Sequence, residues 1–408
     1  MQKIRMGVIY GGPSVEHEIA VLSACQAMAA VDTDKYEVIP IFITKKGLWY
    51  TGEALKDVKN YAELDNLLKQ CQQVHMTADR GAHKLIIPKK GLFGKAEDIQ
   101  LDVMVPVMHG AHGEDGCLQG LLELLNIPYA GPGVLGAAVG MDKIMMKAVL
   151  KSADIPVVEG VYFTTEEWYA EREAKMDLIE EKLGYPVIVK PANLGSSVGI
   201  GKADNRDSLA AALDYSATFT GRLLIEHCVT NMREINCSVL GGGGSARTSV
   251  CEEPITGSEF LTYEDKYMGG GKGAKGSKGS AQGMSGSRRE IPADLPKEMS
   301  DTIRDLAKRS FIALDGSGVC RVDIILDVDK NQPYVNEVNT IPGSLSFYLW
   351  EATGLSFTEL MDELVNIALK RQRTKESYTL SFDTNILAGA AGGGVKGAKG
   401  AKGVKSGI

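Results

Sequence analysis

Short apolar runs bounded by glycine or proline alternate with stretches of helical period along the first part of the chain. Such runs are typical of parallel strands that are buried on both faces and connected by helices. The pattern predicts strands at 4–10, 38–43, 101–107, 157–163, 187–191, 223–226, 235–240, 321–326 and 333–338. It predicts helices at 16–30, 58–71, 166–183, 208–217, 297–313 and 357–371. This order of elements indicates a mixed α/β fold that opens with a parallel sheet.

Composition changes this picture only locally. The chain has 408 residues, of which 44% are hydrophobic and 24% charged, as is usual for a globular protein of two or three domains. Many of its 47 glycines fall in residues 269–287 and 389–408, which are rich in lysine, contain no acid and share the sequence KGAKG. Because such segments cannot build a packed core, we expect a mobile loop in the first and a flexible tail in the second.

Charge and cysteine usage limit the environment and the partners. The formal net charge is −7, and no apolar stretch approaches the length of about 18 residues that crosses a bilayer. The N-terminus leads directly into a predicted strand, without the apolar core of a signal peptide. We therefore expect a cytoplasmic protein that binds neither membranes nor nucleic acid. The seven cysteines are scattered without C-x-x-C spacing, which favours buried free thiols over a metal site or disulfides.

Glycine-rich turns follow two of the predicted strands. The first, GGPSVEHE, spans residues 11–18, and the second, HGAHGEDG, spans 109–116. Glycines at the carboxyl end of a strand let backbone N–H groups face a ligand, and Glu16 projects from the start of the next helix. An acid at a helix start also simply favours the helix dipole, and the second turn is equally compatible with a helix cap at Asp115. GPGVLG, at 131–136, matches G-x-G-x-x-G but lies too far from the first strand to be a dinucleotide site.

Two lysines and two acids suggest a nucleotide site in the middle of the chain. Lys190 ends a wholly apolar strand, where an uncompensated ammonium is costly to bury, so we expect it to meet an anion. The loop after it, 193–199, offers hydroxyls and backbone donors that suit phosphates. Lys143 is a second lysine at a helix start, and Glu226 and Glu234 flank a short connection between strands, where acids can face an adenine amino group and ribose hydroxyls.

Acidic and amide side chains recur on two predicted strands near the C-terminus. Asp323, in RVD, and Glu337 and Asn339, in NEVN, point to one face because alternate residues of a strand share a side. Three oxygen ligands of this kind suit magnesium held together with substrate phosphates. Arg321 shares the face and is placed to stabilise negative charge in a transition state. The alternative is a solvated face of salt bridges.

In this order, the motifs GGPSVEHE, HGAHGEDGCLQG, GMDK, KPANLGSSVGI, YEDKY, RVD and NEVNTIPG resemble those of the D-alanine–D-alanine ligases of the ATP-grasp superfamily. The resemblance covers residues 4 to about 372 and implies a three-domain ATP-grasp fold with ATP between two antiparallel sheets. It implies a Rossmann-like parallel-sheet domain at 1–131, ATP-grasp subdomains at 132–226 and 227–372, a lid loop at 263–289 and a tail at 373–408.

The resemblance implies a reaction and its cofactors. ATP phosphorylates the carboxylate of one D-alanine, the amine of a second D-alanine attacks the acyl phosphate, and the dipeptide serves peptidoglycan synthesis. The family's ATP-binding and metal-binding residues match lysines, acids and an amide of this chain. They are Lys143 and Lys190 for the phosphates, Glu226 and Glu234 for adenine and ribose, and Asp323, Glu337 and Asn339 for two Mg²⁺ or Mn²⁺ ions.

The resemblance also implies residues that bind and activate the amino acids. Arg321 and the backbone N–H of Gly343 match the groups that hold the developing oxyanion. The donor-site and lid residues that match are Glu16 for the ammonium of the first D-alanine, His109 near its carboxylate, Ser196 as the link from Glu16 to Tyr267, and Lys266 with Tyr267 on the lid. Tyr267 favours an amine over a hydroxyl acceptor, and a homodimer is common in the family.

One departure from the family pattern concerns the second substrate. Where the family often has a serine that contacts the second amino acid's carboxylate, this chain has Phe347 and Tyr348. We therefore predict that Tyr348 lies at the second subsite. A ligase that makes D-Ala-D-Ser or D-Ala-D-lactate is one alternative, and a nucleotide-sensing protein that has kept the fold and lost turnover is another.

Overall fold

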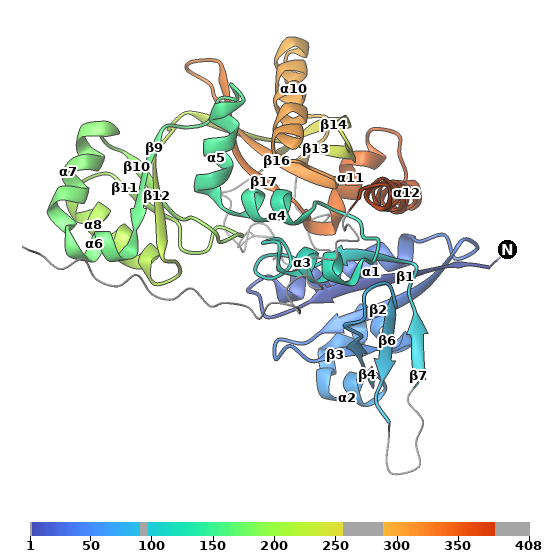
Figure 1. The fold of residues 1–408 in the computed structure, drawn as a ribbon. Helices are drawn as coiled ribbons and strands as arrows, with labels where there is room; N and C mark the ends of the chain where they lie inside the picture. The colour runs from blue at the N-terminus through green and yellow to red at the C-terminus, as the bar shows by residue number, and fades with distance from the viewer. Residues whose placement is uncertain (1, 90–96, 256–288, 380–408) are drawn as a thin grey trace, which may run out of the picture. The chain divides into compact units, whose positions relative to one another are not determined.

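The computed structural model describes residues 2–89, 97–255 and 289–379 (Figure 1). The chain divides after Arg371, and the fold and the candidate site lie in the part that ends there. Lys266 and Tyr267 lie outside the described residues, as do most of the predicted lid loop and most of the predicted tail.

The N-terminal sheet has five strands in the order β4-β3-β2-β1-β8. β1 (Ile4–Gly11) pairs in parallel with β2 (Tyr36–Ile43) and with β8 (Val103–Val107). β3 (Trp49–Thr51) and β4 (Gln72–Gln73) extend it in antiparallel pairing. The parallel pairs confirm the predicted layer, because β8 is buried at every residue, as expected of a strand covered on both faces.

Helical segments around this sheet follow the prediction only in part. α1 (His17–Ala30) begins one residue after Glu16, as expected. The helix predicted at 58–71 starts as a 3₁₀ turn, η2 (Val58–Glu63), preceded by η1 (Glu53–Lys56) and followed by α2 (Leu64–Lys69). The sequence did not indicate the small antiparallel sheet of β5 (His75–Met76), β6 (Lys84–Ile87) and β7 (Glu97–Gln100). The predicted helices also did not include α3 (Cys117–Leu125) or α4 (Val134–Met141), whereas α5 (Lys143–Ser152) begins at Lys143, which the sequence placed at a helix start.

The second sheet is antiparallel in the order β11-β10-β12-β9. Its strands are β11 (Gly201–Ala203), β10 (Val187–Pro191), β12 (Arg222–His227) and β9 (Gly160–Thr164). The helix predicted at 166–183 is two helices, α6 (Thr165–Ala170) and α7 (Arg172–Lys182), and α8 (Arg206–Ala217) follows. The two helices meet at Glu171, whose backbone angles (φ −134°, ψ 42°) are not helical, and Trp168 and Arg172 on either side of it both donate to the carboxylate of Asp214 on α8 (2.9 and 2.7 Å).

The third sheet is antiparallel in the order β15-β14-β13-β16-β17. Its strands are β15 (Arg289–Glu290), β14 (Ser245–Pro254), β13 (Met232–Gly242), β16 (Gly318–Asp327) and β17 (Gln332–Asn339). α10 (Lys297–Ala313), whose bounds match the prediction, lies across this sheet (Figure 1) and buries Ile303 and Phe311 against Val322 and Ile324. Because strand side chains alternate, Arg321 and Asp323 face away from α10.

The segment after β17 returns toward the N-terminal sheet. η4 (Gly343–Ser346), α11 (Phe347–Glu351) and α12 (Phe357–Glu376) follow in turn. Trp350 and Leu360 belong to the same buried cluster as Tyr10 and Phe42 of the first sheet. The three larger sheets arise from successive stretches of the chain, in agreement with the predicted fold class. The exact domain boundaries stay a prediction.

All seven cysteines are free thiols, as predicted, but only six are buried. Cys117 is exposed, because it begins α3 after the turn at Gly116, so that part of the prediction was wrong. Among the described residues, no helix combines the length and the apolar character that a membrane span requires.

Candidate active site

The face of β16 and β17 opposite α10 gathers the predicted metal and oxyanion residues. The strand register places Asp323 directly across from Glu337 and Arg321 directly across from Asn339. The guanidinium of Arg321 donates two hydrogen bonds of 2.6 Å to the carboxylate of Asp323. The amide of Asn339 donates to the same carboxylate at 3.0 Å. The prediction that these side chains share one face is therefore confirmed, while their roles stay predictions.

The donor set on this face suits a hard divalent cation. Two carboxylates and an amide supply only oxygen ligands, which Mg²⁺ and Mn²⁺ prefer. Asp323, Glu337 and Asn339 come from two adjacent strands, so the backbone hydrogen bonds of the sheet hold their spacing. The residues present are therefore compatible with the predicted metal.

Both predicted phosphate lysines are buried and reach the same region. The ammonium of Lys143, at the start of α5, donates to the carbonyl of Leu194 (2.8 Å) and lies 3.4 Å from a carboxylate oxygen of Glu337. The ammonium of Lys190, on β10, donates to the side chain of Asn336 (2.9 Å) and forms a 2.6 Å ion pair with Glu226. These contacts place Lys143 of α5 against Glu337 of the third sheet and Lys190 of the second sheet against Asn336 of the third.

Sequence reasoning missed a third buried lysine. Lys147 lies one turn after Lys143 on α5 and forms an ion pair with Glu226. The i, i+4 spacing from Lys143 was the available signal, because it puts both side chains on one helix face. Burial by itself raises the pKa of Glu226, but Lys147 and Lys190 outweigh it and lower that pKa to about 2. Glu226 is thus an ionised carboxylate between two ammonium groups.

The two predicted nucleoside acids lie in different surroundings. Glu226 is buried on β12, with both carboxylate oxygens directed at lysines. Glu234 is half-buried on β13, opposite Ile325 of β16. The structure therefore gives Glu226 a direct part in holding Lys190, beside its predicted part in adenine or ribose binding.

The loop after β10 meets the start of α1. The hydroxyl of Ser196 donates a hydrogen bond to the carboxylate of Glu16, and both residues are buried. Ser196 and Ser197 have positive φ angles of 54° and 59°, a left-handed conformation that costs free energy in residues other than glycine. The contact is the one that the family resemblance implies for these two residues. Its extension to Tyr267 falls outside the described residues.

Glu114 is a buried acid that the sequence did not single out as a site residue. Its carboxylate accepts hydrogen bonds from the backbone N–H of Gly110 (2.9 Å), the backbone N–H of Ile341 (2.8 Å) and the hydroxyl of Thr340 (3.3 Å). It therefore ties the HGAHGEDG turn to the segment that follows Asn339. Burial, reinforced by the negative charge of Glu16, raises the pKa of Glu114 to about 7.

This raised pKa predicts a pH-dependent stability. Below the ordinary pKa of 4.5 Glu114 is protonated in both states, and as pH rises through about 7 the folded protein must bury a charge that the unfolded chain exposes to water. Because the unfolded chain releases this proton near pH 4.5 and the folded protein keeps it until about pH 7, we expect the free energy of unfolding to fall between these two pH values by up to about 3 kcal/mol through this group. Glu114→Gln cannot titrate and should flatten that slope in urea unfolding.

The exposed Glu298 supplies the matched control for this prediction. Glu298→Gln should keep the wild-type slope of unfolding free energy against pH. Identical slopes for Glu114→Gln and the wild type would show that Glu114 does not titrate in this range.

His109 connects three segments of the site. Its Nδ1 lies 2.8 Å from the carbonyl oxygen of Ile341, and its Nε2 lies 2.9 Å from the hydroxyl of Ser23. The hydroxyl of Ser23 in turn accepts a hydrogen bond from the backbone N–H of Ser344 (2.9 Å). Burial lowers the pKa of His109 to about 4, so the ring is neutral at pH 7. His109 thereby helps to fix the backbone on both sides of Gly343.

The backbone after Gly343 is held in an uncommon conformation. Ser344, Leu345 and Ser346 all have φ angles between 50° and 52°, in the left-handed region. Such strain persists only where the surrounding structure enforces it, and it clusters at functional sites. The contacts of Ser23 and His109 supply part of that restraint next to the predicted oxyanion glycine.

A second polar cluster lies on the third sheet and includes Tyr348 of α11. Its hydroxyl donates to the buried carboxylate of Glu252 on β14 (3.0 Å), which also accepts from Asn236 (3.1 Å) and Arg289 (3.0 Å). The guanidinium carbon of Arg289 lies 4.0 Å from the centroid of the Tyr348 ring. The sequence indicated Tyr348 but gave no sign of Glu252, because its partners are remote in the chain.

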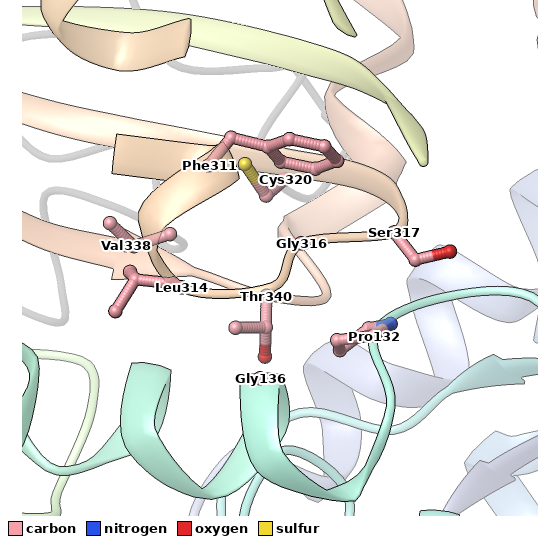
Figure 2. Close-up of a pocket in the computed structure, with 9 residues that line it drawn as sticks. All are labelled: Pro132, Gly136, Phe311, Leu314, Gly316, Ser317, Cys320, Val338 and Thr340. Carbon is pink, nitrogen blue, oxygen red and sulfur yellow. The ribbon is translucent and has the colours of Figure 1, made fainter. Parts of the chain in front are cut away.

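A small cavity lies behind this region, between α4 and the connection from α10 to β16 (Figure 2). Phe311, Leu314, Val338 and Thr340 are among the residues that line it, and none of the predicted site residues does. A Cβ on Gly136 would come within 2.8 Å of the carbonyl oxygens of Leu314 and Asp315. This glycine of the GPGVLG segment therefore permits close helix packing, a structural role that involves no dinucleotide.

Two antiparallel sheets, one carrying the buried Lys190 and the other the paired Asp323 and Glu337, have the arrangement of the ATP-grasp fold. Residues 5–132 match the family model described as D-ala D-ala ligase N-terminus, and residues 149–366 match D-ala D-ala ligase C-terminus. This chain belongs to the D-alanine–D-alanine ligase family.

Individual relatives agree over most of their length. The D-alanine–D-alanine ligase of Acetivibrio thermocellus is 40% identical over 381 residues, covering 90% of this chain and 96% of the relative. The solved D-alanine–D-alanine ligase from Coxiella burnetii has a TM-score of 0.74 at 29% identity, covering 92% of this chain and 97% of that one. The VanG D-Ala:D-Ser ligase from Enterococcus faecalis has a TM-score of 0.75 at 30% identity, covering 90% and 100%.

Proposed function

We propose that the protein joins two D-alanine molecules at the expense of ATP, through a D-alanyl phosphate, and forms D-alanyl-D-alanine, ADP and phosphate for peptidoglycan synthesis. The observation that carries the proposal is the arrangement of Arg321, Asp323, Glu337 and Asn339 on one face, with the Lys143 ammonium 3.4 Å from Glu337. Family membership supports the same reaction.

The first chemical problem in this reaction is repulsion between two anions, ATP and a carboxylate. The buried ammonium groups of Lys143 and Lys190 lower that repulsion and orient the phosphates. Asp323, Glu337 and Asn339 would hold Mg²⁺, which would further neutralise the phosphate charge. We propose two such ions, with Mn²⁺ as a substitute.

The second problem is to hold the donor amino acid and to stabilise the oxyanion. The ionised carboxylate of Glu16, oriented by Ser196, pairs with the ammonium of the first D-alanine. Arg321 and the backbone N–H of Gly343 donate to the oxygen that becomes negative when the second amine attacks. Lys266 and Tyr267, which the family resemblance assigns to the lid, lie outside the described residues.

A product assay tests the proposal. Purified protein with ATP, Mg²⁺ and D-alanine should form D-alanyl-D-alanine, measured by mass spectrometry, with one ADP released for each dipeptide. L-alanine serves as the control substrate and should give no dipeptide. ADP release without dipeptide would contradict the proposed reaction.

A D-Ala-D-Ser ligase is the second candidate, because the VanG D-Ala:D-Ser ligase has a similar structure and Tyr348 replaces the usual second-site serine. Competition between D-alanine, D-serine and D-lactate as acceptors at neutral pH separates the candidates. Preference for D-serine or D-lactate would reassign the product. A silent nucleotide sensor is disfavoured by the intact set of Arg321, Asp323, Glu337 and Asn339.

The remaining proposals concern where and how the enzyme works. We propose that it acts in the cytoplasm, where ATP is available, on small-molecule substrates and without nucleic acid or membrane partners. We also propose a homodimer, which light scattering of the purified protein tests directly.

A further inference from the structure

Glu252 is a buried acid for which the proposed reaction has no role. Its side chain is among the most deeply buried charges of the described residues, with 1% of its surface exposed. One carboxylate oxygen accepts from Tyr348 and Asn236, and the other accepts from Arg289. Three partners from α11, β13 and β15 satisfy a charge that would otherwise be costly to bury.

The position of Glu252 in the sheet connects it to the catalytic face. Asn236 pairs with Glu252 on β14 and with Asp323 on β16, which in turn pairs with Glu337 on β17. Directly paired residues of antiparallel strands project to the same side. One polar row therefore runs from Glu252 through Asn236 and Asp323 to Glu337.

Tyr348 is held at two points by this cluster. Its hydroxyl is fixed by Glu252, and its ring is covered by the guanidinium of Arg289, whose side chain is 10% exposed. Burial, with the charge of Glu252, raises the pKa of Tyr348 to about 12, so the hydroxyl stays protonated and keeps donating. Tyr348 and Glu252 also act electrostatically on Arg321, which places the cluster next to the proposed oxyanion site.

This arrangement has the properties of one wall of an acceptor site. The acceptor is a small amino acid with a carboxylate, and two cations are near Tyr348: Arg289 covers its ring, and Arg321 is close enough to interact with it electrostatically. Glu252 partly neutralises these cations and keeps the ring in one orientation. A binding-site wall that is already ordered before the substrate arrives lowers the entropy cost of binding. Loosening that wall therefore weakens substrate binding more than it slows the chemical step.

We propose that Glu252 is a positioning residue for the acceptor subsite, where it holds Tyr348 and Arg289 beside Arg321. The inference rests on the proposed ligase function and adds to it the residues that set affinity for the second amino acid. Glu252 acts through its neighbours and does not itself touch the substrate.

The test measures the KM for the second D-alanine, the KM for ATP and kcat in Glu252→Gln. Loss of a charged hydrogen-bond acceptor should raise the KM for the second D-alanine about tenfold, while the KM for ATP and kcat stay within about threefold of wild type. Tyr348→Phe removes only the hydroxyl and should change the same KM. The double variant should show less than the sum of the two free-energy effects, because both changes break one hydrogen bond.

Glu253→Gln is the matched control. Glu253 is the next residue of β14, points to the other side and pairs with Arg233, so its variant should keep the wild-type acceptor KM. An unchanged acceptor KM in both Glu252→Gln and Tyr348→Phe would overturn the inference, and so would an equal rise in both KM values. If the wild type forms no dipeptide at all, the proposed function itself is wrong.

Discussion

Replacement of Glu337 by alanine is expected to lower kcat for dipeptide formation by at least about a thousandfold. The carboxylate lies opposite Asp323, supplies a proposed metal ligand and is 3.4 Å from the ammonium of Lys143. Its loss removes one of two acidic ligands and leaves the buried lysine without this ion pair. Coupled detection of ADP in the presence of D-alanine and saturating Mg²⁺ measures the effect.

Two variants show whether the effect is local. Glu337→Gln keeps an oxygen ligand without the charge and should fall between the wild type and Glu337→Ala. Asp329→Ala removes an exposed carboxylate in the turn between β16 and β17 and should leave kcat within about twofold of wild type. Near-normal turnover of Glu337→Ala would mean that the metal and phosphate site lies elsewhere.

Replacement of Lys147 by methionine is expected to destabilise the fold by about 3 kcal/mol and to raise the KM for ATP. The carboxylate of Glu226 is 2% exposed and is ionised because Lys147 and Lys190 flank it. Without Lys147, Lys190 must neutralise Glu226 alone and becomes less available to a phosphate. Urea unfolding and steady-state kinetics measure the two effects.

Lys151 provides the comparison on the same helix. It lies one turn after Lys147 on α5, and its ion pair with Glu159 is exposed. Lys151→Met should cost less than about 1 kcal/mol, because exposed ion pairs contribute little. Equal losses of stability in Lys147→Met and Lys151→Met would show that the buried group of Lys147, Glu226 and Lys190 does not stabilise the fold.

The predicted elements that agree with the structure are those whose pattern is local. α10 has the predicted bounds because an apolar stripe of helical period runs along its whole length. β14 was missed because its sequence, SARTSVCEEP, mixes polar and apolar residues without regular alternation. The helix expected at 166–183 is interrupted at Glu171, whose backbone angles (φ −134°, ψ 42°) are not helical, and the local pattern gave no sign of this break.

The residues of the candidate site also form two groups: those that local motifs indicated and those that only the folded structure reveals. Motifs led to Glu16, Lys190, Arg321, Asp323 and Glu337, because each stands at a strand end, a helix start or an alternating strand position. Glu114 lay in the HGAHGEDG turn without being distinguished as a site residue, and Glu252 gave no such signal. Their partners are 226 and 96 residues away along the chain, at Thr340 and Tyr348, and only folding brings them together.

The sequence by itself determined the parallel sheet at the start of the fold, the ligase family and the shared face of Arg321 and Asp323, the last because period-two alternation is a property of a single strand. The tertiary structure alone decided the register that sets Asp323 against Glu337, the pairing of Lys147 with Glu226, and the burial of Glu252 beneath Tyr348. The physical reason is that a buried charge is stable only with partners, and those partners come from segments that meet only in the folded chain.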